Sequence, residues 1–255
     1  MKKFLKITSI VLVIALVAVF AACGAKGDTD TDSDAKPVLT MATNAEFPPY
    51  EYVEEGKIVG IDAEIAALIA EKLGMELQIV DIAFDSIVPG VQSGKYDMGM
   101  AGLTVNDERL EKVNFSTSYA TGVQVVIVAE DSAIKTLDDV LGKKIGVQTS
   151  TTGDIYATDD FGEDAITRYD NGAVAVQALI AGKVDCVIID NEPAKSYVAA
   201  NEGLKILETE YAVEDYAICF NKADTELQEK VDGALKELIA DGSVKNVIDK
   251  YISAE

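Results

Sequence analysis

The alternation of short apolar runs with amphipathic helical patterns is the feature that most constrains how this chain of 255 residues can fold. From Val38 onward, apolar runs alternate with stretches whose apolar residues recur every three or four positions. In residues 60–74, for example, Ile61, Ile65 and Ile69 fall on one helical face. Such alternation is typical of α/β proteins, in which helices cover mostly parallel sheets.

The same pattern defines the individual elements along the chain. The predicted strands are residues 38–42, 76–82, 96–103, 122–129, 144–148, 165–169, 186–190, 204–207 and 216–220. The predicted helices are residues 60–74, 87–94, 107–113, 136–142, 172–182, 192–200, 225–242 and 243–252. A chain of this length can bury a sizeable core, in one large or two modest domains.

The N-terminal segment predicts export rather than a folded element. Residues 1–22 contain three early lysines, an apolar run and then small residues before Cys23, which is typical of a secretory signal. The end of this segment resembles a bacterial lipoprotein cleavage box, although Phe20 stands where Leu is commoner. We therefore expect lipidation of Cys23; a transmembrane anchor and a chance cysteine are the alternatives. The polar, acidic residues 23–37 predict a flexible tether.

The charge of the chain excludes some partners. Its formal net charge is −22, so nucleic acid and anionic lipid surfaces would repel it. Asp28, Asp30 and Asp32 have the alternating spacing of a calcium loop, but Ser33 occupies the glycine position and Leu39 the final glutamate position. We therefore expect no metal site.

Cysteine and histidine usage bears on redox state and catalysis. Cys186 and Cys219 lie in apolar runs and are most simply buried hydrophobic residues, although an exported protein could join them in a disulfide. The chain has no histidine, the commonest acid–base catalyst, and no Ser or Cys stands beside a candidate base. We therefore expect a protein that is not an enzyme.

Polar loops follow four of the predicted strands. Ligands of open α/β sheets bind at the carboxyl ends of strands, so these loops are the candidate site. The four loops have the sequences TNAEFPPYEY (residues 43–52), TVNDER (residues 104–109), QTSTTGD (residues 148–154) and DNEPA (residues 190–194).

Arg109 lies near the start of a predicted helix, after a turn at Gly102. Helix N-termini favour negative charge, because their first backbone N–H groups are unpaired and the macrodipole is positive there. A carboxylate bound at this point would gain those donors and a bidentate guanidinium together. The alternatives are that Arg109 pairs with a neighbouring surface acid such as Glu108, and that Thr104 caps the helix with Asp107 as its partner.

Asp190 ends the apolar run of residues 186–190. It is either the N-cap of a helix that begins near Glu192 or a counter-ion for an ammonium group. The loop of residues 149–154 supplies hydroxyl groups and backbone donors, unless it is an ordinary turn and helix cap. An arginine from one half of the chain and an aspartate from the other would together bind a zwitterion.

Four stretches together carry a resemblance to a known family. ATNAEFPPYEY, GIDAEIAALIAEKL, AGLTVNDER and VDCVIIDNEPA, in this order and spacing, resemble the amino-acid-binding members of the extracellular solute-binding protein family 3, the receptors of bacterial ABC importers. The resemblance covers residues 38–255. It implies a periplasmic-binding-protein-like fold of type II, with two α/β lobes joined by a two-stranded hinge.

The resemblance also implies the extent of each lobe. Lobe 1 would comprise residues 38–121 and 217–255, and lobe 2 residues 122–216 with the hinge segments at its ends. The protein would capture a free L-amino acid by closing its lobes. It would then deliver this ligand, as a monomer lipid-anchored outside the bacterial cell membrane, to an ABC permease with its ATPase subunits. No cofactor is implied.

Family roles fall on particular residues. Arg109 would hold the ligand α-carboxylate, assisted by Thr104, by the backbone at Gly102 and, from the other lobe, by Thr152. Asp190 would hold the α-ammonium group, helped by the carbonyl of Gly102. Together these residues would bind the part that all amino acids share.

The ligand side chain would meet a different set of residues. Phe47 and Phe84 would sandwich it, unless these aromatics belong to the core. Asn44 and Gln148 match positions where the family varies its side-chain contacts. Cationic amino-acid binders often carry an acid at the position of Asn44, so a neutral polar ligand is favoured. Glu46 and Asp85 lie nearby, and either acid could reverse this preference.

Two alternatives from other functional classes share the same fold. Some relatives are dehydratases of cyclohexadienyl acids, and Glu46 or Asp190 could serve such an enzyme as an acid. A sensor that reports the ligand to a membrane kinase or chemotaxis receptor would have the same site and different partners. ATP binding by this chain itself is not expected, because no Walker-type glycine loop is present.

Overall fold

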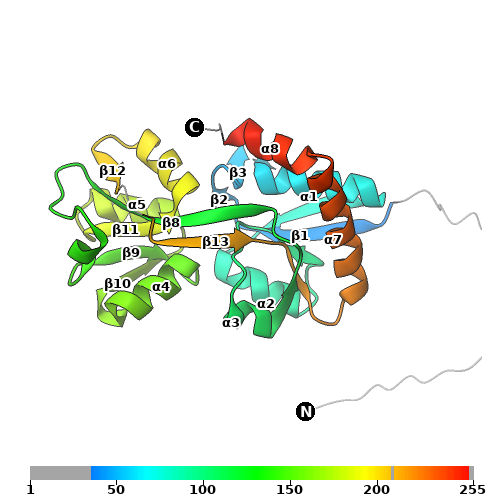
Figure 1. Cartoon of the computed structure of the whole chain (residues 1–255), viewed down its shortest axis with the longest axis horizontal. Coiled ribbons are helices and arrows are strands. Elements are labelled where there is room, and N and C mark those ends of the chain that lie inside the picture. Colours follow the sequence, from blue (N-terminus) through cyan, green and yellow to red (C-terminus); the bar gives the residue numbers. More distant parts are fainter. Residues whose placement is uncertain (1–35, 208–209, 253–255) are drawn as a thin grey trace, which may run out of the picture. The chain divides into compact units, whose positions relative to one another are not determined.

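The computed structural model describes residues 36–207 and 210–252, and residues 36–255 form one compact unit. The predicted signal segment, Cys23 and nearly all of the tether lie outside the described residues. Two α/β lobes, each with its own main sheet, are connected by long strands (Figure 1). Within the described stretches, no helix is long and apolar enough to cross a membrane.

Lobe 1 is built on a five-stranded sheet. In the order in which they pair, its strands are β5 (Glu76–Asp81), β1 (Val38–Thr43), β6 (Met98–Gly99), β14 (Cys219–Asn221) and β7 (Val113–Phe115). A small antiparallel sheet beside it consists of β2 (Glu46–Phe47), β3 (Glu51–Glu54) and β4 (Lys57–Val59).

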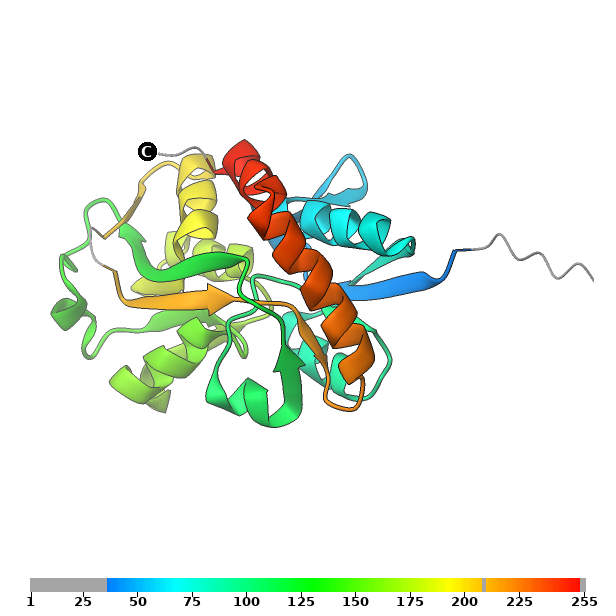
Figure 2. The same cartoon turned by 45° about the vertical axis from the view of Figure 1, so that its right-hand side comes forward.

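The helices of lobe 1 cover its main sheet. They are α1 (Ile61–Leu73), η1 (Phe84–Ser86), α2 (Ile87–Gln92), α3 (Asp107–Lys112), α7 (Thr225–Ala240) and α8 (Ser243–Tyr251). The predicted apolar face of α1 is confirmed, because Ile61, Ile65 and Ile69 are fully buried. The C-terminal helices α7 and α8 pack against α1 (Figure 2).

Lobe 2 contains a six-stranded sheet. Its strands are β10 (Ile166–Tyr169), β9 (Ile145–Gln148), β11 (Cys186–Asp190), β8 (Ala120–Ala129) and β12 (Leu204–Ile206), with β13 (Ala212–Tyr216) paired to β8. Its helices are η2 (Leu137–Val140), α4 (Thr152–Phe161), η3 (Glu163–Ala165), α5 (Gly172–Ile180) and α6 (Asn191–Ala200).

Two antiparallel strands carry the chain between the lobes. β8 and β13 lie side by side: β8 runs from lobe 1 into the sheet of lobe 2, and β13 runs back toward lobe 1 (Figures 1 and 2). Tyr216 pairs with Ala120 at the lobe 1 end of this ribbon, and Ala212 pairs with Gln124 further along it. This is the two-stranded hinge that the resemblance implied.

The expectation of mostly parallel sheets is confirmed for the direction of the strands, with one antiparallel strand in each main sheet. In lobe 1, β14 runs antiparallel to β6 and β7. In lobe 2, β8 runs antiparallel to β11 and β12. Parallel pairing follows from helical crossovers within one sheet, whereas β8 and β14 enter their sheets from the other lobe and are free of that constraint.

Two predicted elements are shorter than expected. Residues 136–142 form only the 3₁₀ helix η2, which a capping box between Thr136 and Asp139 holds at its start. The strand predicted at residues 96–103 is reduced to Met98–Gly99, because the chain turns at Gly102, where φ is 51°. Cys186 and Cys219 are buried and free, in different lobes, so no disulfide joins them.

Candidate ligand-binding site

The predicted site residues come together in one cavity between the lobes. Its lining includes Asn44, Phe47, Phe84, Gly102, Thr104 and Arg109 from lobe 1, and Gln148, Thr152 and Asp190 from lobe 2. Glu51, Ala101 and Thr151 complete it. The convergence follows from the fold, since most of these residues follow a strand at its carboxyl end or lie near the start of a helix.

Arg109 reaches this cavity from α3. The N-cap of α3 is Asn106, whose side-chain oxygen accepts the Arg109 backbone N–H at 2.8 Å. The predicted cap, Thr104, is wrong: it forms a β-bridge with Tyr216 of the hinge, and this tertiary pairing holds it outside the helix. The helix itself starts at Asp107, as predicted, with Asn106 in place of Thr104 as its cap.

The guanidinium of Arg109 is buried, with 7% of the residue exposed. Its Nη1 donates to the Thr104 carbonyl at 2.8 Å and its Nη2 to the Ser150 carbonyl of lobe 2 at 3.1 Å. The group lies 5.4 Å from the centre of the Phe84 ring. Among the described residues, no carboxylate lies within ion-pair distance of it, so the alternative of a surface salt bridge is wrong.

Asp190 enters from the other lobe at the end of β11. It is 7% exposed, and the Tyr216 hydroxyl of the hinge donates to its Oδ1. Although Asp190 occupies the N-cap position of α6, its side chain makes no capping hydrogen bond. Burial raises the pKa of Asp190 to about 7, and the nearby charge of Glu214 adds to the effect.

Several contacts join the lobes across this cavity. Gln148 Nε2 donates to Asn44 Oδ1 at 3.0 Å, and the hydroxyl oxygens of Thr104 and Thr152 are 3.4 Å apart. At the rim, the Tyr197 hydroxyl donates to the backbone carbonyl of Glu46 at 2.7 Å. The lobes are therefore closed on one another at the predicted site.

The loop of residues 149–154 is both a helix cap and part of the site. Thr151 is the N-cap of α4 and its side chain accepts the Asp154 N–H at 3.3 Å, while the Asp154 carboxylate accepts the Ser150 N–H at 3.0 Å. The first turn of α4 thereby holds Thr152 in the cavity lining, where its hydroxyl donates to Glu214 Oε2 at 3.0 Å.

Sequence reasoning missed the buried acids of the site. Glu51 lines the cavity and is fully buried, and neither of its carboxyl oxygens has a hydrogen-bond partner in the described part of the chain. Asp62, also fully buried, accepts the Gly102 N–H at 2.9 Å. That N–H is consequently already engaged. The only sequence signal was that Glu51 and Asp62 fall within the PPYEY and GIDAEI stretches.

Glu214 and Gln124, on the two hinge strands, form a second network that sequence reasoning missed. Gln124 Nε2 donates to Glu214 Oε2 at 2.9 Å, the same oxygen that accepts the Thr152 hydroxyl. Because Thr152 lines the cavity, this network links the hinge to the site.

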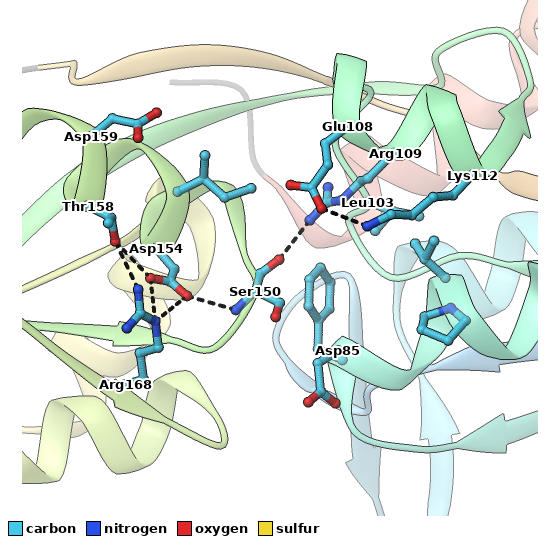
Figure 3. Close-up of a pocket in the computed structure, with 14 residues that line it drawn as sticks. Asp85, Leu103, Glu108, Arg109, Lys112, Ser150, Asp154, Thr158, Asp159 and Arg168 are labelled. Atoms are coloured by element: carbon cyan, nitrogen blue, oxygen red, sulfur yellow. Dashed lines mark hydrogen bonds and ion pairs between the residues drawn. The ribbon is translucent and has the colours of Figure 1, made fainter. Parts of the chain in front are cut away.

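A wider cleft of about 380 Å³ adjoins the inner cavity and shares Phe84 and Arg109 with it (Figure 3). Lys112 pairs with Glu108 at 2.7 Å on one side, and Arg168 pairs with Asp154 at 2.9 Å on the other. Because both of these cations are neutralised, Arg109 is the cation at this boundary that remains available to an anionic group.

The raised pKa of Asp190 predicts a pH-dependent stability. The unfolded chain holds Asp190 at its ordinary pKa of 3.8, against about 7 in the fold. Between these values the native state keeps a proton that the unfolded state releases, so the group lowers stability as pH rises through this interval. We expect Asp190→Asn to be more stable than wild type by over about 1 kcal/mol at about pH 8, since one pKa unit corresponds to about 1.4 kcal/mol.

Thermal unfolding of the ligand-free protein checks this prediction. The advantage of Asp190→Asn should shrink as the pH falls toward about 4, where Asp190 is protonated in the fold and begins to be protonated in the unfolded chain. Asp85→Asn, at an exposed carboxyl group, is the control and should follow the wild-type profile. Parallel profiles for wild type and Asp190→Asn would contradict the prediction.

The fold and the site define a class before any relative is considered. Two α/β lobes joined by a two-stranded hinge, with a polar cavity between them, are the architecture of type II periplasmic binding proteins. Solved structures agree. The arginine-, lysine-, histidine-binding protein ArtJ of Geobacillus stearothermophilus superposes with a TM-score of 0.81 at 36% identity, covering 85% of this chain and 96% of that one.

The sequence comparisons identify the family. Residues 39–254 match the bacterial extracellular solute-binding proteins, family 3, and the chain belongs to this family. It is 30% identical over 260 residues, the whole of both chains, to the arginine-binding extracellular protein ArtP of Bacillus subtilis. An ancestral arginine-binding protein bound to glutamine superposes with a TM-score of 0.81 at 37% identity, covering 86% of this chain and 99% of that one.

Proposed function

We propose that this protein is the extracytoplasmic receptor of an amino-acid ABC importer and binds a free L-amino acid between its lobes. The observation that carries this proposal is the pairing of a buried Arg109 from lobe 1 with a buried Asp190 from lobe 2 in one cavity. A zwitterion satisfies both groups at once. An uncharged ligand would leave both without a counter-charge, which is costly in a buried site.

Each predicted residue has a role in this proposal. Arg109 binds the α-carboxylate, assisted by Thr104, whose hydroxyl donates to it, and by Thr152 from the other lobe. Asp190 binds the α-ammonium group. Phe47 and Phe84 pack against the side chain of the ligand, whose polar end meets Asn44 and Gln148. The backbone at Gly102 lines the same space, and its carbonyl is the atom that assists Asp190.

Capture requires the lobes to open. The inner cavity has a volume of about 10 Å³, which is about the space that one water molecule needs. An amino acid can therefore enter only when the Asn44–Gln148 and Thr104–Thr152 contacts separate. Bound ligand replaces these contacts with stronger, charge-assisted ones, so it binds the closed state preferentially and shifts the population toward it.

The side-chain preference of the site has two candidates. Asn44, where cationic amino-acid binders often carry an acid, favours a neutral polar ligand. Glu51 supplies an acid to the same cavity from β3, with both carboxyl oxygens unpartnered, and this observation favours a cationic side chain. Similar solved structures include an ancestral arginine-binding protein bound to glutamine and an arginine-, lysine-, histidine-binding protein. Because Glu51 is buried within the lining itself, we favour the cationic ligand.

The remaining parts of the proposal concern assembly and location. Residues 38–121 and 217–255 form the first lobe and residues 122–216 the second. The closed receptor docks on a membrane permease whose ATPase subunits drive import. Lipidation of Cys23 keeps the protein, as a monomer, at the outer surface of the cell membrane.

Thermal unfolding with each common L-amino acid tests the proposal on residues 36–255, unfolded and refolded first to remove carried-over ligand. A ligand at about one hundred times its dissociation constant contributes about 2.7 kcal/mol, or roughly 5–10 °C for a domain of this size. We expect this shift for arginine or lysine. Glu51→Gln should reduce the shift with arginine and spare any shift with glutamine.

The outcomes separate the candidates. A shift with glutamine or asparagine and none with arginine would establish the neutral polar ligand instead. A folded protein that no amino acid stabilises would contradict the zwitterion site.

A further inference from the structure

A pair of buried carboxyl groups lies under the ligand cavity. Glu51 on β3 and Asp62 at the start of α1 are both fully buried. Asp190 lines the same cavity from lobe 2 and is also buried. Three carboxyl groups thus share one region of low polarity, where like charges repel strongly.

The hydrogen bonds distinguish the two members of the pair. Oδ2 of Asp62 accepts the Gly102 N–H at 2.9 Å and the Tyr119 hydroxyl at 3.0 Å, which stabilise a negative charge on Asp62. Oδ1 of Asp62 and both carboxyl oxygens of Glu51 have no partner among the described residues. The carboxyl groups of Glu51 and Asp62 lie within hydrogen-bonding reach of each other. Two ionised carboxylates offer only acceptors to each other, whereas one proton placed on Glu51 supplies the missing donor.

The charges around Glu51 favour its neutral form. The negative charges of Asp62, Asp190 and Asp81 all act on Glu51. The tyrosines that interact with Glu51 in turn are Tyr50, Tyr119 and Tyr197. Burial raises the pKa of Glu51 well above its ordinary value, and the charge of Asp62 adds to this. Among the described residues that line the cavity, Arg109 is the only cation.

We propose that Glu51 and Asp62 form a buried proton-binding site, and that a ligand with a positively charged side chain displaces this proton when it is captured. The inference rests on the proposed function. A guanidinium or ammonium group in the cavity supplies both the positive charge and the hydrogen-bond donors that the proton had provided. The proton passes to solvent, so the buried region has the same net charge before and after capture.

Titration calorimetry with L-arginine in buffers of different ionisation enthalpy measures this exchange. At about pH 8, Asp190 is mostly ionised and contributes little background, given its pKa of about 7. We expect release of about one proton per arginine bound, and an affinity that rises about tenfold per pH unit. L-Glutamine, which has no side-chain charge, should release far less.

Two variants identify the source of the proton. Glu51→Gln keeps the shape of the side chain and removes the titration, so arginine binding should become weaker and release almost no proton. Glu54→Gln, an exposed acid on the same strand, is the matched control and should behave as wild type. Equal proton release by wild type and Glu51→Gln would overturn the proposal, while leaving the amino-acid receptor intact.

A measurement without ligand keeps the inference testable if binding itself fails. At about pH 8, where Asp190 is mostly ionised, the infrared spectrum should contain the carbonyl band of a protonated, buried carboxyl group, and this band should disappear in Glu51→Gln. Absence of the band in wild type would overturn the proposal independently of the amino-acid panel. If the band is present and no amino acid binds, the proposed function is wrong, whereas the buried proton-binding site is supported.

Discussion

Arg109→Ala weakens binding of the captured amino acid by about 30-fold or more, the largest effect on binding that we expect from one substitution. Removing one partner of a buried, hydrogen-bonded charge pair costs about 2–5 kcal/mol, and every 1.4 kcal/mol is about tenfold in affinity. Arg109 has no carboxylate partner within the described residues, so its charge is left for the ligand. Calorimetric titration with the amino acid that the panel identifies measures the loss.

Arg168→Ala is the matched control for this experiment. Arg168 lines the wider cleft from lobe 2 and is paired with Asp154 and Glu163 (Figure 3). Its removal should change affinity by only a few-fold. Because Arg109 also donates to two backbone carbonyls, thermal unfolding must show that the alanine variant is folded. A folded Arg109→Ala protein with wild-type affinity would place the carboxylate site elsewhere.

Gly60→Ala has the largest effect on stability that we expect. Gly60 is the N-cap of α1 with φ at 122°, a conformation that side-chain-bearing residues rarely adopt. A Cβ atom there would lie 2.2 Å from the Tyr50 carbonyl oxygen and 2.8 Å from that of Pro49. Because the obstacles are backbone atoms, the strand end or the helix start must move. We expect a loss of at least about 3 kcal/mol in unfolding free energy.

Gly233→Ala shows what the same substitution does without a clash. Gly233 lies inside α7, and nothing is within 4 Å of its added Cβ. Helix propensity then favours alanine by about 0.8–1 kcal/mol, so this variant should be slightly more stable than wild type. Chemical denaturation of both variants gives the comparison. A Gly60→Ala protein as stable as Gly233→Ala would contradict the strain at the start of α1.

The residues that line the cavity could be found from sequence because their positions follow a simple rule. Gln148 and Asp190 end strands, and Arg109 begins a helix that follows one. Ligands of α/β sheets bind at such points. Each loop could therefore be assigned to the candidate site by itself, without knowing how the two lobes face each other.

The acids and the hinge network could not be found in this way. Glu51 stands within a strand and Asp62 within a helix, where an isolated acid is usually a solvated residue. Gln124 and Glu214 meet only because β8 and β13 pair across 90 residues of chain. Likewise, Thr104 looked like a cap until its bridge to Tyr216 was known. Each of these depends on pairing between distant segments, which local sequence patterns do not specify.

The position of β14 determines the order in which the molecule can be completed during synthesis. This strand fills an interior position of the first sheet, between β6 and the edge strand β7, yet it comes from residues 219–221, far along the chain from the other strands of that sheet. A nascent chain emerges from its N-terminus, so the first sheet has a gap between β6 and β7 until this segment is available. The second lobe, nearly continuous in sequence, has no such delay. The lobe whose synthesis begins first is therefore completed last. A chain truncated before Cys219 lacks β14 and cannot complete the sheet of that lobe.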